Sequence, residues 1–249
     1  MSQTLVLDVG NSRMKWGLHG PRGWMGAGVT PNTEIGTLSL RDWQTLPRPV
    51  RVIGVNVAGE AARVRVEAQI ARWRLVPQWL TASAAACGVV NSYRVPSQLG
   101  PDRWASLVAA RQRTLQDGVP TAAIVVNAGT AVTIDALDRE GRFLGGLIVP
   151  GLRLMLRALA ENTSALRVTP GTFTAFPDNT ADALYSGAVQ AVTGAIHQMR
   201  AGLEHDGEPA RCFLAGGAAP EIAPHLTGSV EVVDNLVLEG VLALADATT

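Results

Sequence analysis

Residues 8–15 read DVGNSRMK, and a related stretch returns at residues 127–135 as NAGTAVTID. An apolar run precedes each stretch, at residues 5–7 and at residues 124–126, and strand-like sequence follows each. A strand, a glycine turn bordered by Asn, Ser or Thr, and a second strand are typical of a β-hairpin with a polar tip. Such a tip offers backbone N–H groups and hydroxyls to a phosphate. The two copies predict two related halves that hold one nucleotide between them.

The composition is that of a globular protein. The chain has 249 residues, of which 47% are hydrophobic and 17% are charged, and its formal net charge is zero. A zero net charge provides no electrostatic surface for nucleic acid, and no apolar run approaches the roughly 20 residues of a membrane span. Cys87 and Cys212 each stand alone, so neither a metal-binding spacing nor a disulfide framework is indicated. We expect a cytoplasmic protein with no nucleic-acid or membrane partner.

In each half of the chain, strands come first and helices later. The patterns predict helices at residues 59–73, 102–115, 152–159, 180–201 and 236–245. They predict strands around both glycine turns and at residues 50–57, 74–76, 143–149, 211–215 and 230–233. Residues 20–49 read as loops and short edge strands, and a break at residues 116–120 divides the chain into domains 1–118 and 119–249. This order favours an α/β protein of two similar lobes.

The first turn combines groups that suit a nucleotide. Gly10 permits a positive φ or the close approach of a ligand. Asp8, at the last strand position before the turn, could hold a hydrated Mg²⁺, and Lys15 could reach a phosphate as a point charge. Taken alone, the turn fits an ordinary hairpin slightly better. The second copy, with Gly129 and Thr130, favours the phosphate-binding interpretation.

Two further positions allow a structural or a functional interpretation. Asp102 follows Pro101 and precedes a helical pattern, so it could simply be a first-turn acid, with Arg103 a solvated helix residue. Alternatively, Asp102 is a general base and Arg103 binds a substrate carboxylate. Thr180 could belong to a plain helix start capped by Asn179, or its hydroxyl could contact a ligand. Judged alone, the structural interpretation of Asp102 is the better one.

The order of the motifs is more informative than any one of them. The chain carries, in turn, DxGNSxxK at residues 8–15, Tyr93 with GPDR at residues 100–103, GTAxTxD at residues 129–135, GGxIxPG at residues 145–151, and Asn179-Thr180. This series resembles the type III pantothenate kinases over nearly the whole chain. The resemblance implies an α/β fold of two ribonuclease H-like lobes of the acetate and sugar kinase/Hsp70/actin superfamily. It also implies a homodimer that uses ATP to phosphorylate pantothenate to 4'-phosphopantothenate, the first step of coenzyme A biosynthesis.

The resemblance assigns a role to each motif. It implies that ATP is bound by Asp8, Val9, Gly10, Asn11, Ser12, Arg13, Met14, Lys15, Gly129 and Thr130. It implies that pantothenate is bound by Tyr93, Gly100, Pro101, Asp102, Arg103 and Thr180. Asp102 would be the general base, and Asp8 would hold Mg²⁺ through a water. Residues 216 and 217 would lie near the adenosine.

One residue departs from the family pattern. Many family members have Asp where this chain has Asn127, and that Asp helps to hold a monovalent cation, K⁺ or NH₄⁺. Asn keeps an oxygen ligand but removes the charge, so we expect a weakened or altered dependence on the monovalent cation. Two alternatives stay open at this point: a sugar kinase of the same superfamily, and a non-catalytic nucleotide-binding regulator of the Bvg accessory factor type.

Overall fold

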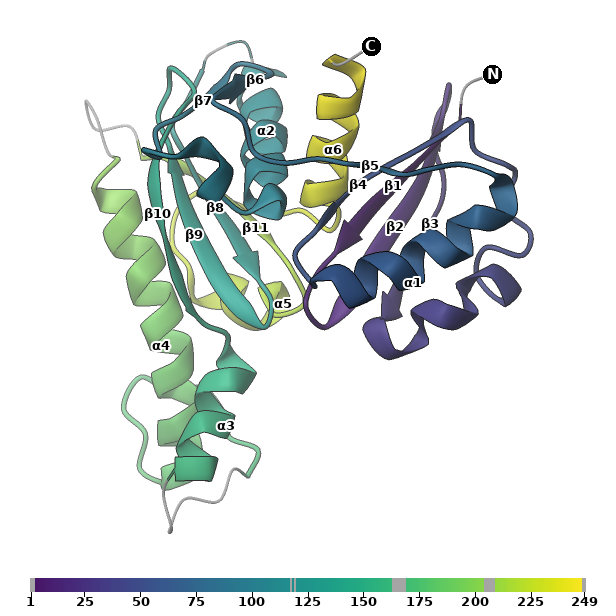
Figure 1. Ribbon diagram of the computed structural model, residues 1–249. Helices are drawn as coiled ribbons and strands as arrows, with labels where there is room; N and C mark the ends of the chain where they lie inside the picture. Colours follow the sequence, from purple (N-terminus) through teal and green to yellow (C-terminus); the bar gives the residue numbers. More distant parts are fainter. Residues whose placement is uncertain (1–2, 117, 119, 163–168, 204–208, 248–249) are drawn as a thin grey trace. The chain divides into compact units, whose positions relative to one another are not determined.

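The computed structural model describes residues 3–116, 118, 120–162, 169–203 and 209–247. Their contacts form two compact units, one of Met1–Gln112 with Asn235–Thr249 and the other of Arg113–Asp234. Each unit is built on a mixed β-sheet (Figure 1). The contacts thus group the last residues with the first unit, while the domain limit at residue 118 stays a prediction. Residues 117 and 119, within the predicted break, lie outside the described residues.

The sheet of the first unit has the strand order β3-β2-β1-β4-β5. Its strands are β1 (Thr4–Val9), β2 (Arg13–Gly20), β3 (Gly23–Pro31), β4 (Arg51–Asn56) and β5 (Gln78–Trp79). The first three strands form an antiparallel meander, whereas β4 runs parallel to β1, and β5 runs parallel to β4. A short antiparallel hairpin, β6 (Ala85–Ala86) and β7 (Val89–Asn91), follows.

Helices pack on both faces of this sheet. The helices of this part of the chain are η1 (Asn32–Leu40), α1 (Glu60–Ile70), η2 (Ala71–Trp73), η3 (Pro96–Gln98), α2 (Pro101–Gln116) and α6 (Leu236–Ala247). Alternate residues of β1, namely Leu5, Leu7 and Val9, join a buried core with side chains of α1 and η1. Successive side chains of a strand point to opposite faces, so Val6 and Asp8 lie on the other face. The final helix α6 contacts β1, β2 and β4.

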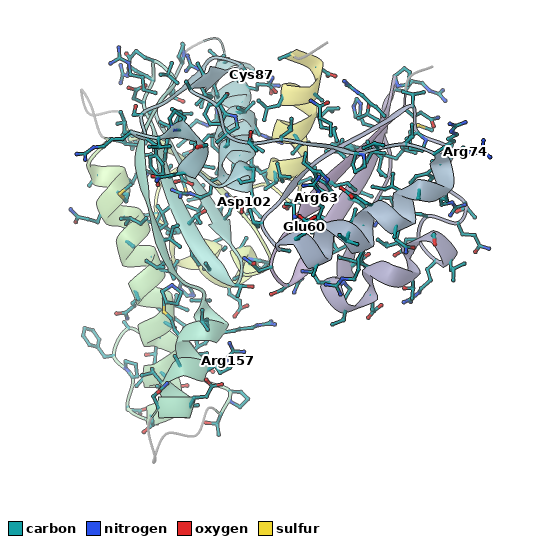
Figure 2. All side chains as sticks on the ribbon, viewed as in Figure 1. Glu60, Arg63, Arg74, Cys87, Asp102 and Arg157 are labelled. Atoms are coloured by element: carbon teal, nitrogen blue, oxygen red, sulfur yellow. The ribbon has the colours of Figure 1, made fainter. Side chains whose placement is uncertain are left out.

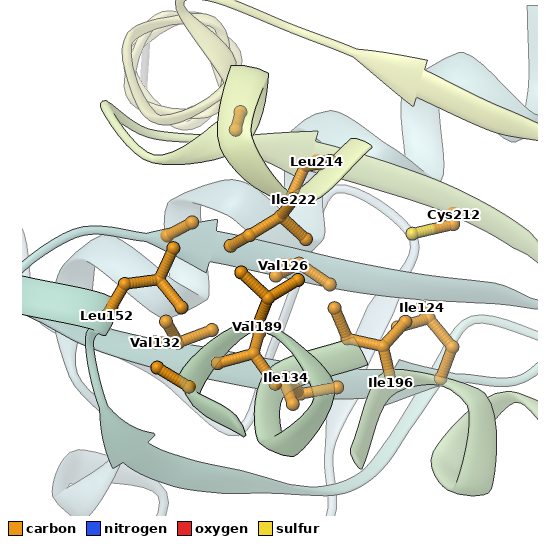
Figure 3. Packing of buried hydrophobic residues seen from close by; sticks show 14 of the residues in the cluster. Ile124, Val126, Val132, Ile134, Leu152, Val189, Ile196, Cys212, Leu214 and Ile222 are labelled. Carbon is orange, nitrogen blue, oxygen red and sulfur yellow. The ribbon is translucent and has the colours of Figure 1, made fainter. Parts of the chain in front are cut away.

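The second unit repeats this arrangement. Its elements are β8 (Ala123–Ala128), β9 (Ala131–Leu137), β10 (Arg142–Pro150), α3 (Leu152–Asn162), α4 (Thr180–Ala201), β11 (Arg211–Ala215), α5 (Ala219–Ile222), η4 (Ala223–His225) and β12 (Val230–Val232). Within this unit the strands follow the order β10-β9-β8-β11-β12, which is the order of the first sheet with each strand replaced by its counterpart. Val126 and Ile134 pack against Val189 and Ile196 of α4 (Figure 3). The duplication read from the two glycine turns therefore extends to the whole sheet.

Most predicted elements occur where the periodicity placed them, and α4 spans the predicted residues 180–201. The strand predicted at residues 74–76 is wrong, because Arg74 has a φ of 56° and the strand pairing begins at Gln78. Residues 20–49 contain a longer element than expected, the nine-residue edge strand β3. Among the described residues, no helix has the length and apolar character needed to cross a lipid bilayer.

The contact between α6 and α2 gives a stability prediction. A Cβ on Gly240 would overlap the backbone carbonyl of Ala105, whereas a Cβ on Gly194, an exposed position of α4, would meet no atom. Ala in place of Gly in a helix interior normally stabilises by about 1 kcal/mol. We expect Gly194→Ala to do so and Gly240→Ala to destabilise by about 1–3 kcal/mol or more, because the two helices must separate.

Urea denaturation of the wild type and of both variants measures these changes. Since the two substitutions are chemically identical, Gly194→Ala is the matched control. A Gly240→Ala variant as stable as the wild type would contradict the close packing of α6 on α2.

Candidate functional site

The first glycine turn joins β1 to β2. The N–H of Gly10 donates to the carbonyl of Arg13 at 3.1 Å, which closes the turn. Asp8 and Lys15 are cross-strand partners in the antiparallel register, so their side chains lie on the same face of the sheet. Lys15 is the single lysine of the chain. One acidic and one basic side chain, Asp8 and Lys15, therefore lie side by side on the two strands that flank the turn.

Asp8 has an unusual electrostatic environment. Its side chain is half-buried, and its pKa is raised from 3.8 to about 7. Desolvation is the main cause, the negative charge of Asp102 is the second, and Lys15 acts in the opposite direction. Since two carboxylates in proximity cannot both ionise freely, Asp8 and Asp102 belong to one electrostatic site within the first unit.

Asp102 lies in the first turn of α2 (Figure 2). One carboxylate oxygen accepts a hydrogen bond from the N–H of Arg103 at 2.8 Å. A Cβ on Gly100 would be 2.6 Å from that oxygen, so glycine leaves the room that the carboxylate occupies. Desolvation raises the pKa of Asp102 in spite of the hydrogen bond from Arg103. The residue is thus both a first-turn acid and a carboxyl group with a base strength above the usual value.

Arg103 is buried, so it is not the solvated helix residue of the structural interpretation. Its guanidinium donates to the hydroxyl of Tyr93 at 3.3 Å and lies 5.8 Å from the centre of the Tyr93 ring. Asn91 fixes the Tyr93 loop, since its Oδ1 accepts from the N–H of Tyr93 and its Nδ2 donates to the carbonyls of Ser83 and Pro96. The pairing of Tyr93 with Arg103 supports a pre-arranged site for an anionic group.

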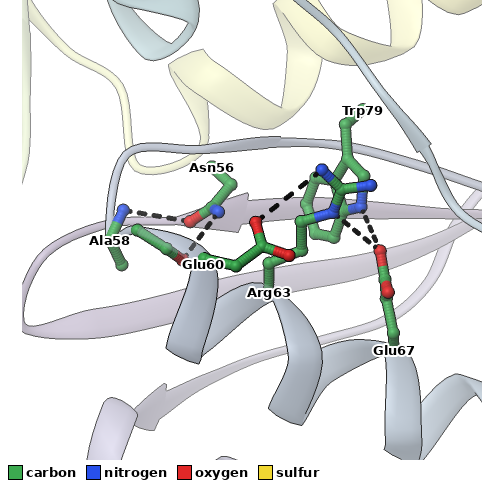
Figure 4. Close-up of polar contacts among 7 residues, drawn as sticks. Asn56, Ala58, Glu60, Arg63, Glu67 and Trp79 are labelled. Carbon is green, nitrogen blue, oxygen red and sulfur yellow. Dashed lines mark hydrogen bonds and ion pairs between the residues drawn. The ribbon is translucent and has the colours of Figure 1, made fainter.

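The connection from β4 to α1 borders the same turn. The N–H of Val57 donates to the carbonyl of Val9 at 2.9 Å. Asn56 accepts from the N–H of Ala58 and donates to the carbonyl of Gly59, and this shapes the start of α1 (Figure 4). Further along α1, Glu67 accepts from Arg63 and from the indole of Trp79 (Figure 4). These contacts explain why the pKa of Glu67 is lowered, and they order the helix without entering the site.

The second turn is one residue shorter than the first. Here Gly129 donates to the carbonyl of Ala131 at 3.0 Å, and Gly129 and Thr130 are both exposed. Asn127 lies opposite Thr133 in the β8–β9 register, at the place where Asp8 faces Lys15 in the first unit. Gly216, with a φ of 103°, approaches the backbone of Ala128 so closely that a Cβ would overlap it. The second turn thus keeps the glycine N–H bond that closes the first but lacks its charges.

Thr180 lies at the start of α4, after Asn179, whose side chain accepts from the N–H of Asp182 and caps the helix. Thr180 is exposed and borders a groove of about 840 Å³ between α3 and α4. Apolar side chains such as Met155, Leu156 and Leu184 form most of its walls. A hydroxyl beside an apolar groove suits a ligand with both apolar and polar parts.

The predicted residues are divided between the two units. Asp8, Lys15, Tyr93, residues 100–103 and the first turn belong to the first unit, whereas Asn127, Gly129, Thr130 and Thr180 belong to the second. That both groups bind one ATP and one substrate stays a prediction. No cluster of three or more His, Cys, Asp or Glu suited to a metal occurs among the described residues. Sequence reasoning missed Asn32 and Asn91. Asn32 contributes hydrogen bonds to backbone atoms distant in sequence, and Asn91 contributes bonds to backbone atoms of the loop around it.

The family model of type III pantothenate kinase matches residues 4–201. A type III pantothenate kinase of Nitrosospira multiformis is 47% identical over 98% of this chain and 92% of its own length. The enzyme of that name from Paracidovorax citrulli is 43% identical over 97% of each chain.

Solved structures agree on the fold. A putative Baf family transcriptional activator from Campylobacter jejuni has a TM-score of 0.65 at 18% identity and covers 98% of each chain. A putative 2-dehydro-3-deoxygalactonokinase from Sinorhizobium meliloti has a TM-score of 0.61 at 14% identity over 98% of this chain and 99% of its own. Together with the repeated strand order, these likenesses confirm the predicted α/β fold of two ribonuclease H-like lobes.

The proximity of Asp8 and Asp102 gives a pH prediction. The folded-state pKa of Asp8, about 7, lies above the ordinary value of 3.8, so the folded protein binds this proton more tightly than the unfolded chain. The contribution of Asp8 to stability should therefore decrease as the pH rises from about 4 to about 7. We expect Asp102→Asn to lower the pKa of Asp8, because one cause of the shift is removed.

A ¹³C NMR titration of the aspartate carboxyl groups tests this, with Asp8→Asn used to assign the resonance. Glu34→Gln removes an exposed carboxylate paired with Arg41 and should leave the titration of Asp8 unchanged. An Asp8 pKa at the ordinary value, or one that Asp102→Asn does not move, would contradict the electrostatic coupling.

Proposed function

This chain belongs to the type III pantothenate kinase family, and we propose that it phosphorylates pantothenate with ATP to give 4'-phosphopantothenate. The observation that carries this proposal is the position of Asp102 in the same unit as the first glycine turn, near enough to Asp8 to raise its pKa. A base and a phosphate-binding turn on one unit are what transfer of a phosphoryl group to a hydroxyl requires. The matches do not favour the sugar-kinase or regulator alternatives.

In the proposed reaction, the primary hydroxyl oxygen of pantothenate attacks the γ-phosphorus of ATP. The new P–O bond forms as the bond from the γ-phosphorus to the β,γ-bridging oxygen breaks, ADP leaves, and the hydroxyl proton passes to Asp102. Burial raises the pKa of Asp102, which makes it a stronger base than an exposed aspartate. Since the transition state is loose, orienting the hydroxyl is a large part of its contribution.

Other residues would position the substrates. Lys15 would neutralise charge on the triphosphate, and the amides of both glycine turns would bind its oxygens. Arg103, held by Tyr93, would bind the pantothenate carboxylate, and Thr180 would contact the same substrate. The homodimer and the cytoplasmic localisation stay predictions.

The first unit also offers a suitable place for Mg²⁺. Proteins bind Mg²⁺ through one or two carboxylates, with waters and substrate phosphates as the remaining ligands. Asp8 supplies such a carboxylate. Its pKa is raised mainly by desolvation and secondly by the charge of Asp102, a repulsion that a cation would relieve. Asp8 would hold the ion through a water, and the ion would neutralise charge on the triphosphate.

The proposal predicts that Asp102→Asn loses turnover while the fold persists. Asn cannot accept the proton, and losing a general base typically lowers the rate by about 10²–10⁴-fold. A coupled ADP-release assay with pantothenate measures kcat, and thermal denaturation checks folding. Glu34→Gln, an exposed carboxylate far along the chain from Asp102, serves as the control and should retain full activity. A folded Asp102→Asn enzyme with wild-type turnover would remove Asp102 from the mechanism.

Because Asn127 carries no charge, we expect the activity to depend only weakly on K⁺ or NH₄⁺. The hydroxyl of Thr133, its cross-strand neighbour, is buried without a hydrogen-bond partner among the described residues, so an oxygen suited to a cation is present while the carboxylate is not. We propose that this residue pair gives weak cation binding. Activity of the wild type should change little in a K⁺ titration, whereas Asn127→Asp should gain saturable activation, because a charged ligand binds the ion more tightly. Strong saturable activation of the wild type would contradict this prediction.

A further inference from the structure

Asn32, the first residue after β3, binds the carbonyl groups of the first glycine turn. Its side-chain Nδ2 donates to the carbonyl of Gly10 at 2.8 Å and to that of Asn11 at 2.9 Å. Its backbone N–H donates to the carbonyl of Ser12 at 3.1 Å. Three successive carbonyls of the turn thus accept hydrogen bonds from one residue. The carbonyl of Asn32 in turn accepts from the guanidinium of Arg65 at 3.2 Å.

These bonds determine where the amides of the turn point. In a planar trans peptide, the C=O and the following N–H point in opposite directions. Because the carbonyls of Gly10 and Asn11 face Asn32, the N–H groups of Asn11 and Ser12 face away from it. Neighbouring N–H groups that share a direction form a concavity that binds anions. Asn32 therefore prepares the turn for a phosphate without touching the phosphate itself.

The oxygen of the Asn32 side-chain amide shows that the N–H donors determine the orientation of this side chain. The Oδ1 of Asn32 is buried and has no hydrogen-bond partner among the described residues. An unsatisfied buried acceptor destabilises a protein. Turning the amide over would not relieve this, since Oδ1 would then face two carbonyl oxygens. The side chain is thus held in an orientation that serves the turn at the expense of its own oxygen.

The second unit has a counterpart at the equivalent position. Asn32 follows Pro31 at the end of β3, and Gly151 follows Pro150 at the end of β10. The N–H of Gly151 donates to the carbonyl of Thr130 at 2.9 Å, just as that of Asn32 donates to Ser12. A Cβ on Gly151 would overlap the carbonyl of Gly129. The shorter turn is therefore supported through direct approach of backbone, with no room for a side chain.

We propose that Asn32 is a positioning residue for ATP, which orients the amides of the first turn toward the phosphates, and that Gly151 has the same role at the second turn. This inference rests on the proposed kinase function. It differs from a purely structural role in one respect: loss of the Asn32 donors weakens nucleotide binding while the binding of pantothenate is retained.

The test compares Asn32→Asp with Asn32→Ala in the full chain. Asp is the closer match in shape, but its carboxylate repels the carbonyls of Gly10 and Asn11 and the bound phosphates, whereas Ala only removes the donors. We expect the Kd of the Mg²⁺ complex of AMP-PNP, measured by calorimetry, to rise about tenfold or more for Asn32→Asp and less for Asn32→Ala. The KM for ATP should rise in the same order, and the KM for pantothenate should stay within about twofold.

Asn162→Asp is the matched control. Its side chain donates to the carbonyl of Ala158 at 2.8 Å on the exposed surface of α3, and it should bind nucleotide like the wild type. Thermal denaturation confirms that each variant is folded, and if Asn32→Asp does not fold, the Kd of Asn32→Ala decides alone.

Wild-type affinity for AMP-PNP in the folded Asn32 variants, or weaker binding by Asn32→Ala than by Asn32→Asp, would overturn the inference. So would a wild-type chain that binds no AMP-PNP. A wild-type chain that binds AMP-PNP without phosphorylating pantothenate would refute the kinase proposal alone, because the binding comparison still tests Asn32.

Discussion

The desolvation of Asp8, to which the negative charge of Asp102 adds, is the physical constraint on the site of the first unit. Burial of two carboxylates near each other destabilises a folded chain unless a cation or a proton is bound between them. The other residues of the strand that carries Asp8 are all buried, and all but Thr4 are apolar, so the fold places this carboxylate at the end of a buried strand. A site that tolerates such repulsion in the free protein gains affinity for a cation with its bound phosphates. The repulsion between the two carboxylates therefore both destabilises the protein without ligand and increases its affinity for the cation.

The duplication shows which parts of the site depend on backbone and which on side chains. Strand order, the glycine N–H bond within each turn, and the supporting N–H from the residue after β3 or β10 occur in both units. These features need only main-chain atoms, so they are retained although the sequences of the two units differ. The side chains differ at each equivalent position: the first unit has Asp8 and Lys15 where the second has Asn127 and Thr133. One turn thus interacts through charges, and the other through neutral groups and close backbone approach.

The sequence predicted the elements whose stability is local and missed those that depend on distant partners. The helix at residues 180–201 has a continuous small and apolar pattern and an Asn179 cap, so its limits follow from local rules. The sequence predicts only loops and short edge strands at residues 20–49, because the segment is rich in glycine, which weakens isolated strands. In the fold, the ring of Trp16 lies over Gly28 and the ring of Trp24 lies over Gly17, where side chains would collide with the indoles. Burial of indole surface from neighbouring strands replaces the packing that the glycines lack.

The same distinction explains the site. Asp8, Gly10, Asp102 and Arg103 belong to short motifs and could be recognised in sequence, although only the structure shows that Arg103 is buried and paired with Tyr93. Asn32 belongs to no motif, because its partners precede it by two strands, β2 and β3, and are carbonyl groups, which any residue provides. The sequence nevertheless contains a signal. Pro31 and Asn32 lie as far along the chain after Gly10 as Pro150 and Gly151 lie after Gly129. In a duplicated fold, alignment of the two halves finds residues that orient the turns, which comparison of motifs cannot find. This works because equivalent positions in the two halves have the same role in orienting a turn.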